Sequence, residues 1–224
     1  MNLASVSENK KFEKRLSITP EIAKKYSNLG FKIFLPNNYG KHLGFNDEDY
    51  NKAGVKLFDK EKDVLANADI ITQLTLPDNE KLSLLKENQT LVGSFNSFLN
   101  KEKLENLKMK KITCFSLELL PRITRAQSMD ILSSQANLAG YKAVIEAFQI
   151  YEKAIPMMMT AAGTIPAAKV LVVGAGVAGL QAIATAKRMG AVVFATDVRQ
   201  ASKEQVESLG GKFLTVEGSE NLET

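Results

Sequence analysis

A glycine-rich turn is the part of the sequence best suited to bind a phosphate. The segment GAGVAG at 174–179 follows the apolar run KVLVV at 169–173 and precedes a segment with helical spacing of its apolar residues. In this spacing Gly174 permits a tight turn, Gly176 lets the backbone approach a pyrophosphate, and Gly179 lets the helix pack closely on the strand. The N-terminus of that helix adds free N–H groups and a positive dipole end. The pattern predicts a dinucleotide site.

An acidic residue ends the next apolar segment, AVVFATD at 191–197. Asp197 can accept hydrogen bonds from the 2′- and 3′-hydroxyls of an adenosine ribose, and its charge repels a 2′-phosphate. We therefore expect NAD(H) in preference to NADP(H). Arg199 is the complication, because a nearby arginine could accommodate that phosphate. The alternative interpretation is a lobe of the same fold that binds no dinucleotide.

A second polar group lies in PRITRAQSMDILSSQAN at 121–137. It comprises Arg122, Gln127, Asp130 and Ser133. A cation, an amide, a carboxylate and a hydroxyl can together orient a carboxamide and a phosphate without acid–base chemistry. The residues alone equally support a polar loop at a helix start, with Ser128 as the cap and Asp130 near the positive end of the helix dipole.

The remaining candidates for chemistry have simpler interpretations. His42 lies in a polar loop and is expected at the surface, Cys114 is expected to be an inert core thiol, and Met157–Met159 are expected to fill gaps in the core. One cysteine excludes an intramolecular disulfide, and one histidine beside it excludes a Cys/His metal cluster. We expect no metal site. Hydrolysis by a Ser/His/Asp arrangement has little support.

The elements that must position these residues alternate between helices and strands, which is typical of α/β layer folds. Thr19 is expected to cap the first helix, with Pro20 at its first position. In the N-terminal half of the chain the expected helices are 20–29, 47–53, 61–66, 80–86 and 101–108, and the expected strands are 31–35, 55–58, 68–74, 90–95 and 112–118.

A long helix is expected from Ser128 to Glu152, where small residues permit close packing, and we interpret it as the bridge between two lobes. The second lobe is expected to contain a strand at 169–173 buried on both faces, a helix at 177–189, a strand at 191–197, a helix at 200–209 and a strand at 212–216. This is one βαβαβ half of a doubly wound fold.

The predicted fold class is therefore α/β, with two Rossmann-like lobes that contain parallel sheets, are joined by a long helix, and of which the second is incomplete. The predicted domains are an N-terminal α/β lobe at 1–127, the connecting helix and linker at 128–163, and the first half of a nucleotide-binding lobe at 164–224.

The composition excludes several classes of protein. The 224 residues are 45% hydrophobic and 24% charged, with a net charge of +4, which is ordinary for a globular protein and excludes a disordered chain. Charge runs mix both signs, so no nucleic-acid surface is expected. The N-terminus does not have the apolar core of a signal peptide. The nearly uncharged segment 154–186 is punctuated by proline and glycine, so we expect a strand and a packed helix there and no membrane span.

Four segments together carry a family resemblance. They are KRLSITPEIAKKY at 14–26, NYGKHLGFNDEDYNKAGV at 38–55, SLELLPRITRAQSMDILSSQANLAGYKAVI at 116–145 and KVLVVGAGVAGLQAIATAKRMGAVVFATDVR at 169–199. They resemble the NAD(H)-binding domain of the alpha subunit of proton-translocating NAD(P) transhydrogenases, in the superfamily that also contains alanine dehydrogenase.

The resemblance implies that Arg122, Gln127 and Asp130, with Ser133, hold the nicotinamide ring for direct hydride transfer to NADP(H) bound by a partner subunit. It also implies a homodimer docked on membrane-spanning, proton-translocating subunits, on the cytoplasmic side of a bacterial inner membrane. The motifs and the resemblance together assign contacts with NAD(H) to Arg122, Ile123, Thr124, Arg125, Gln127, Asp130, Ser133, Asn137, Gly174, Gly176, Val177, Gly179, Asp197, Val198 and Arg199.

Two other functions stay open. Alanine dehydrogenase, the nearest relative, uses a lysine near the segment matching 70–77 and a histidine near position 96; this chain has no lysine between Ala66 and Leu76, and Asn96 stands at the second position. Arg15 matches that branch's substrate-carboxylate arginine. The resemblance also implies that family members continue beyond VEGSENLET, so we expect a fragment or split product, and a non-catalytic NAD-binding module is the third possibility.

Overall fold

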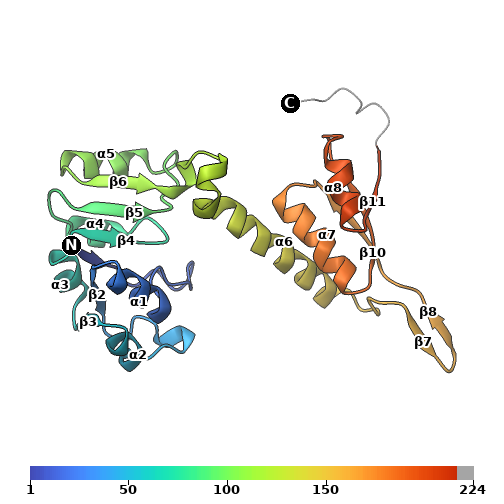
Figure 1. The fold of residues 1–224 in the computed structure, drawn as a ribbon, viewed down its shortest axis with the longest axis horizontal. Coiled ribbons are helices and arrows are strands. Elements are labelled where there is room, and N and C mark those ends of the chain that lie inside the picture. The colour runs from blue at the N-terminus through green and yellow to red at the C-terminus, as the bar shows by residue number, and fades with distance from the viewer. Residues whose placement is uncertain (216–224) are drawn as a thin grey trace. The chain divides into compact units, whose positions relative to one another are not determined.

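The structure is a computed structural model that describes residues 1–215. The chain divides into two compact units, Met1–Asp130 and Ile131–Thr224 (Figure 1). Each unit has a parallel sheet and an apolar core of its own.

The first unit is built on a six-stranded parallel sheet with the order β3-β2-β1-β4-β5-β6. Its strands are β1 (Asn2–Ala4), β2 (Lys32–Pro36), β3 (Val55–Phe58), β4 (Ile70–Thr72), β5 (Thr90–Gly93) and β6 (Thr113–Ser116). The order reverses between β1 and β4, as in doubly wound folds. The segments that follow these two strands therefore meet at the carboxyl edge of the sheet.

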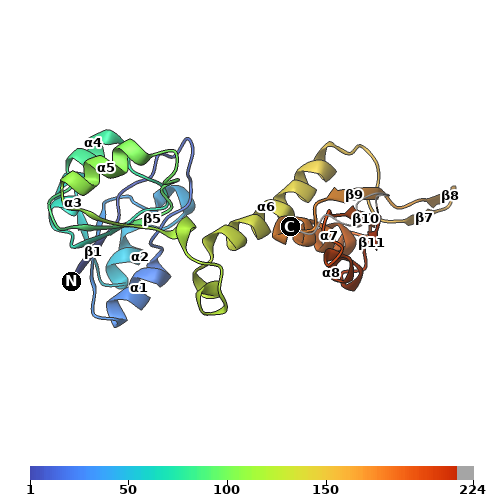
Figure 2. The same cartoon turned by 90° about the horizontal axis from the view of Figure 1, so that it is seen from above.

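Five α-helices cover this sheet. They are α1 (Pro20–Asn28), α2 (Asp47–Lys52), α3 (Glu61–Ala66), α4 (Asn79–Ser83) and α5 (Lys101–Met109), with short 3-10 helices at η1 (Lys41–Leu43), η2 (Leu117–Leu119) and η3 (Thr124–Met129). Figure 2 shows α1 and α2 on one side of the sheet and α4 and α5 on the other. One apolar cluster contains Ile18, Leu35 and Tyr50, and another contains Leu65 and Leu91, so both faces are buried.

The second unit contains one βαβαβ half. Its parallel sheet has the order β11-β10-β9, formed by β9 (Lys169–Val173), β10 (Val192–Thr196) and β11 (Lys212–Phe213). The helices are α6 (Ile131–Ile150), α7 (Val177–Arg188) and α8 (Ser202–Ser208), and an antiparallel hairpin joins β7 (Met158–Thr160) to β8 (Gly163–Ile165). Ile183, Val193 and Val206 are central to its core.

Helices α6 and α7 lie unusually close together. A Cβ atom at Gly140 would lie 2.0 Å from the carbonyl oxygen of Ala178. Only glycine allows this approach, which is the close packing expected of the small residues in the long helix.

The predicted α/β class is confirmed, and most predicted elements are found within a few residues of their expected bounds. The Oγ1 of Thr19 accepts a hydrogen bond from the N–H of Ile22, and Pro20 opens α1, as predicted. Strand β1 was not predicted, although it lies between β2 and β4. None of the helices in residues 1–215 has the length and apolar character needed to cross a membrane.

Three sequence-based expectations are wrong. The long helix begins at Ile131, so Ser128 lies in η3 and does not cap it. Met157–Met159 do not fill the core, because they lie at and before the exposed hairpin and Met159 is 84% exposed. Strand β9 is not buried on both faces: Leu171 and Val173 are exposed, because β9 is the last strand of the sheet within the described residues.

Candidate functional site

The glycine turn between β9 and α7 has the geometry that its spacing favours. Gly174 has a φ of +94°, a conformation that residues with a side chain rarely adopt, and its N–H donates to the carbonyl oxygen of Thr196 at 2.8 Å. A Cβ atom at Gly179 would lie 1.8 Å from the carbonyl oxygen of Gly174. The turn and the start of the helix are therefore packed so closely that glycine is required at both positions.

Gly176 differs from these two glycines because it faces open space. No neighbouring atom lies within 4 Å of the position that its Cβ would take. Gly176 also stands at the N-cap of α7, where no side chain accepts the first N–H groups of the helix. The N-terminus of a helix attracts anions, so the turn leaves room for a phosphate next to suitable donors.

Asp197 completes this arrangement from the end of β10. Its Oδ2 accepts a hydrogen bond from the N–H of Ala175 at 2.6 Å, inside the glycine turn. Its Oδ1 accepts hydrogen bonds from the N–H and the Nε of Arg199 at 2.8 and 3.0 Å. The Arg199 guanidinium therefore holds the pKa of the Asp197 carboxyl well below its usual range. Only 6% of the Asp197 side chain is exposed, and the residue is a permanent anion beside the turn.

The structure therefore brings together those predicted site residues that lie around the glycine turn in the second unit. They are Gly174, Gly176, Val177, Gly179, Asp197, Val198 and Arg199. The side chain of Val198 is exposed beside the Asp197–Arg199 pair. These residues form one site with a cationic helix end, an anion and space between them.

The remaining predicted site residues lie on two other segments. Arg122, Ile123, Thr124, Arg125 and Gln127 are exposed in the loop that contains η3, and Asp130 ends this loop. Ala126 is the buried residue that anchors it, and its N–H donates to the carbonyl oxygen of Ile123 at 2.9 Å. Ser133 and Asn137 are one turn apart on α6 of the second unit, so they share a helix face.

Glu118 anchors the start of this loop, and sequence analysis missed it. Its carboxylate accepts hydrogen bonds from the N–H of Phe95 at 3.1 Å, the N–H of Ser97 at 3.0 Å and the Oγ of Ser97 at 2.8 Å. Partial burial raises the pKa of Glu118, but these hydrogen bonds outweigh it and the pKa is lowered. A charged residue at the end of an apolar strand was the signal that could have found it.

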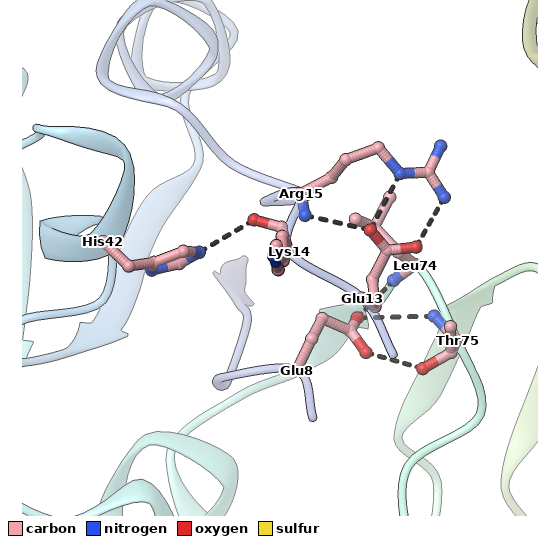
Figure 3. Close-up of polar contacts among 7 residues, drawn as sticks. All are labelled: Glu8, Glu13, Lys14, Arg15, His42, Leu74 and Thr75. Atoms are coloured by element: carbon pink, nitrogen blue, oxygen red, sulfur yellow. Dashed lines mark hydrogen bonds and ion pairs between the residues drawn. The ribbon is translucent and has the colours of Figure 1, made fainter. Parts of the chain in front are cut away.

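A second polar cluster lies at the carboxyl edge of the six-stranded sheet (Figure 3). The guanidinium of Arg15 donates to Glu13 through Nε at 2.9 Å and Nη2 at 2.6 Å. Glu8 accepts hydrogen bonds from the N–H of Leu74 and the Oγ1 of Thr75, both at 2.6 Å. Two carboxylates of this chain thus engage the donors around the point where the strand order reverses.

The other candidates fall outside both clusters of chemistry. His42 is exposed, as predicted, and its Nε2 lies 2.8 Å from the carbonyl oxygen of Lys14. Burial raises the pKa of the Cys114 thiol, which agrees with an inert thiol. Within residues 1–215, no group of three or more histidine, cysteine, aspartate or glutamate side chains is placed to hold a metal ion.

Two family models match the chain. Residues 5–139 match the alanine dehydrogenase/PNT N-terminal domain, and residues 143–224 match the alanine dehydrogenase/PNT C-terminal domain. The chain is 48% identical over 222 residues to the first of the polypeptides that make up the NAD(P) transhydrogenase alpha subunit of Rhodospirillum rubrum, covering 97% of this chain and 58% of that protein. It is 47% identical to the polypeptide of the same name from Rickettsia prowazekii (strain Madrid E), covering 100% of this chain and 59% of that protein.

A solved structure has the same fold. The crystal structure of transhydrogenase from Sinorhizobium meliloti superposes with a TM-score of 0.91 at 46% identity, covering 96% of this chain and 64% of that chain. The chain thus spans less than two thirds of the proteins it matches.

Proposed function

The chain belongs to the alanine dehydrogenase/PNT family, and from this premise we propose that it is the NAD(H)-binding component of a transhydrogenase. The observation that carries the proposal is the ionised Asp197 carboxylate bonded to the glycine turn at the start of α7. The names of the relatives from Rhodospirillum and Rickettsia support it, since both are named as transhydrogenase alpha subunits.

The residues around the turn fit a dinucleotide. The open face of Gly176 and the N-terminus of α7 would receive the pyrophosphate, and Asp197 would accept hydrogen bonds from the adenosine ribose. The carboxylate would oppose a 2′-phosphate, which favours NAD(H) over NADP(H). Hydride exchange is the chemistry that the nucleotide supplies when it is bound.

The nicotinamide end is assigned to the polar residues of the second group. Arg122, Gln127 and Asp130, together with Ser133, would orient the carboxamide and the adjacent phosphate, so their role is positioning. Val177 and Val198 would line the adenosine half. Ile123, Thr124, Arg125 and Asn137 would complete the contacts of the nicotinamide half.

The partners follow from the same proposal. NADP(H) would be bound by a separate transhydrogenase subunit, and the chain would work as a homodimer beside membrane-spanning subunits that carry the proton, on the cytoplasmic side of a bacterial inner membrane. The relatives are named as one portion of an alpha subunit, which supports function within a larger assembly.

Calorimetric titration with NADH, with NADPH as the control, tests the proposal. We expect NADH to bind and NADPH to bind much more weakly. Hydride transfer is then assayed after adding NADP(H)-binding and membrane subunits of the same source. Equal binding of NADH and NADPH would contradict the role of Asp197, and absence of NADH binding would contradict the proposed function.

An alanine-dehydrogenase-like activity is less well supported. Oxidation of an amino acid needs a proton acceptor near the substrate, and position 96 is an exposed asparagine with a φ of +50°. The guanidinium of Arg15 is held by Glu13. Oxidation of NADH that depends on pyruvate and ammonium would revive this alternative.

A further inference from the structure

Arg199 lies where a 2′-phosphate of an adenine nucleotide would approach, but it is already engaged. Its Nε and Nη2 donate to the two carboxylate oxygens of Asp197, at 3.0 and 3.2 Å, and its own N–H donates to Oδ1 at 2.8 Å. The arginine side chain is 50% exposed, whereas Asp197 is 6% exposed. Arg199 therefore covers the carboxylate from the solvent side.

The pair has one group left over for a ligand. Within residues 1–215 the Nη1 of Arg199 has no hydrogen-bond partner, because the two bonds to Asp197 use Nε and Nη2. A guanidinium can form a two-pronged contact with a phosphate through its free edge. In Arg199 the negative charge of Asp197 lies directly behind this edge, so the net charge offered to an incoming phosphate is close to zero.

Resting on the proposed function, we propose that Arg199 is a specificity-determining residue, a 2′-phosphate ligand that Asp197 keeps neutralised. The preference for NAD(H) is then a property of the pair. Asp197 repels the phosphate and at the same time withholds the neighbouring cation that could bind this phosphate. Releasing Arg199 gives the site affinity for nucleotides that carry a 2′-phosphate.

The structure supplies a substitution that separates this effect from damage to the turn. Asp197 also accepts the N–H of Ala175, so its complete removal would disturb the glycine turn. Asparagine keeps an oxygen for that N–H and removes the charge. Asp197→Asn therefore frees Arg199 while the turn stays in place.

The test uses two matched probes, adenosine 5′-monophosphate and adenosine 2′,5′-bisphosphate, which differ only in the 2′-phosphate. Each is titrated by calorimetry into the wild-type chain and the variants Asp197→Asn, Arg199→Gln and Asp197→Asn/Arg199→Gln, with NADH and NADPH as a second pair. The single variant Asp197→Asn is expected to bind the bisphosphate at least about tenfold more tightly than wild type, the effect of one charge-assisted contact. The double variant is expected to lose this gain.

Arg199→Gln alone is expected to keep the wild-type preference, because the carboxylate remains. Equal affinity of Asp197→Asn and the double variant for the bisphosphate would overturn the inference while leaving the proposed function intact. A wild-type chain that binds neither NADH nor the monophosphate would overturn the proposed function, and this inference with it. Thermal melting of each variant checks folding, and Asp197→Ser, which also keeps an oxygen near Ala175, replaces Asp197→Asn if that variant melts early.

Discussion

Asp197 is the residue on which the nucleotide assignment depends most directly. Replacing it with alanine removes the acceptor for the ribose hydroxyls, and each hydrogen bond to a charged acceptor is worth about 1.5–3 kcal/mol. We therefore expect Asp197→Ala to weaken NADH binding at least about tenfold in a calorimetric titration. Glu204→Ala, which removes an exposed carboxylate from the first turn of α8, is the control and should leave the affinity unchanged. Equal affinity of the two variants would contradict the assignment of Asp197.

The ionisation of Asp197 makes a second prediction at the same scale. The Arg199 guanidinium, together with the N–H groups of Arg199 and Ala175, holds the pKa of Asp197 below its ordinary value of 3.8. A carboxyl with a lowered folded pKa stabilises the protein fully above its unfolded pKa, and this contribution disappears as the pH falls through the folded pKa. NADH affinity measured by titration is therefore expected to be constant between roughly pH 5 and 8. A marked change within this range would mean that another group controls binding.

At the scale of elements, the glycines of the turn have different duties that substitution can separate. A Cβ at Gly179 would collide with the carbonyl oxygen of Gly174, whereas one at Gly176 meets nothing. Gly179→Ala is expected to lower the free energy of unfolding by about 1–3 kcal/mol, the usual cost of overpacking. Gly176→Ala is expected to keep the stability but to weaken NADH binding, since its methyl group enters the space for the pyrophosphate. Urea unfolding and NADH titration check both, and equal loss of stability in the two variants would contradict this division.

The Glu118 anchor connects the end of β5 with η2 and the loop that follows. Glu118→Ala leaves the N–H groups of Phe95 and Ser97 without their acceptor, and we expect a loss of about 1–3 kcal/mol in the unfolding free energy of the first unit. Urea unfolding followed by circular dichroism measures it. Glu105→Ala breaks an exposed ion pair with Lys108, so a change of about 0–1 kcal/mol is expected there. Similar losses in both variants would show that Glu118 is not an anchor.

Most elements were predictable because their local signals and their tertiary surroundings agree. Thr19 and Pro20 mark the start of α1, and the run at 169–173 marks β9 with its observed bounds. Strand β1 was missed because three residues at the chain start have too little periodicity, and its pairing with β2 and β4 is long-range. Met157–Met159 were misplaced because apolar composition does not reveal whether a hairpin finds a surface to pack on.

The candidate site was predictable to a different extent in its two halves. The positions of Gly174 and Gly179 follow from a spacing that has one geometric solution, so composition and order sufficed. The pairing of Asp197 with Arg199 was not foreseen, since a sequence shows only that both charges are near the turn. Glu118 was missed because its partners, Phe95 and Ser97, are distant in the sequence.

For the whole molecule, the residues assigned to NADH are distributed over the two compact units. The glycine turn and Asp197 belong to the second unit, while Arg122, Gln127 and the rest of the η3 loop belong to the first. The adenosine half of NADH is assigned to the former and the nicotinamide half to the latter. The two assignments can therefore be tested separately with one nucleotide and one of its fragments.

Hydrogen exchange measured by mass spectrometry makes this separation. Adenosine 5′-monophosphate is expected to slow exchange at 174–179 and 197–199 only, because it has no nicotinamide. NADH is expected to protect the same amides and also those of 122–130, since ligand contacts suppress the local opening that exchange requires. The exposed hairpin at 158–165, which has no assigned role in binding, is the internal control. Protection by NADH confined to the second unit would remove the η3 loop from the site, and the nicotinamide would then need other partners.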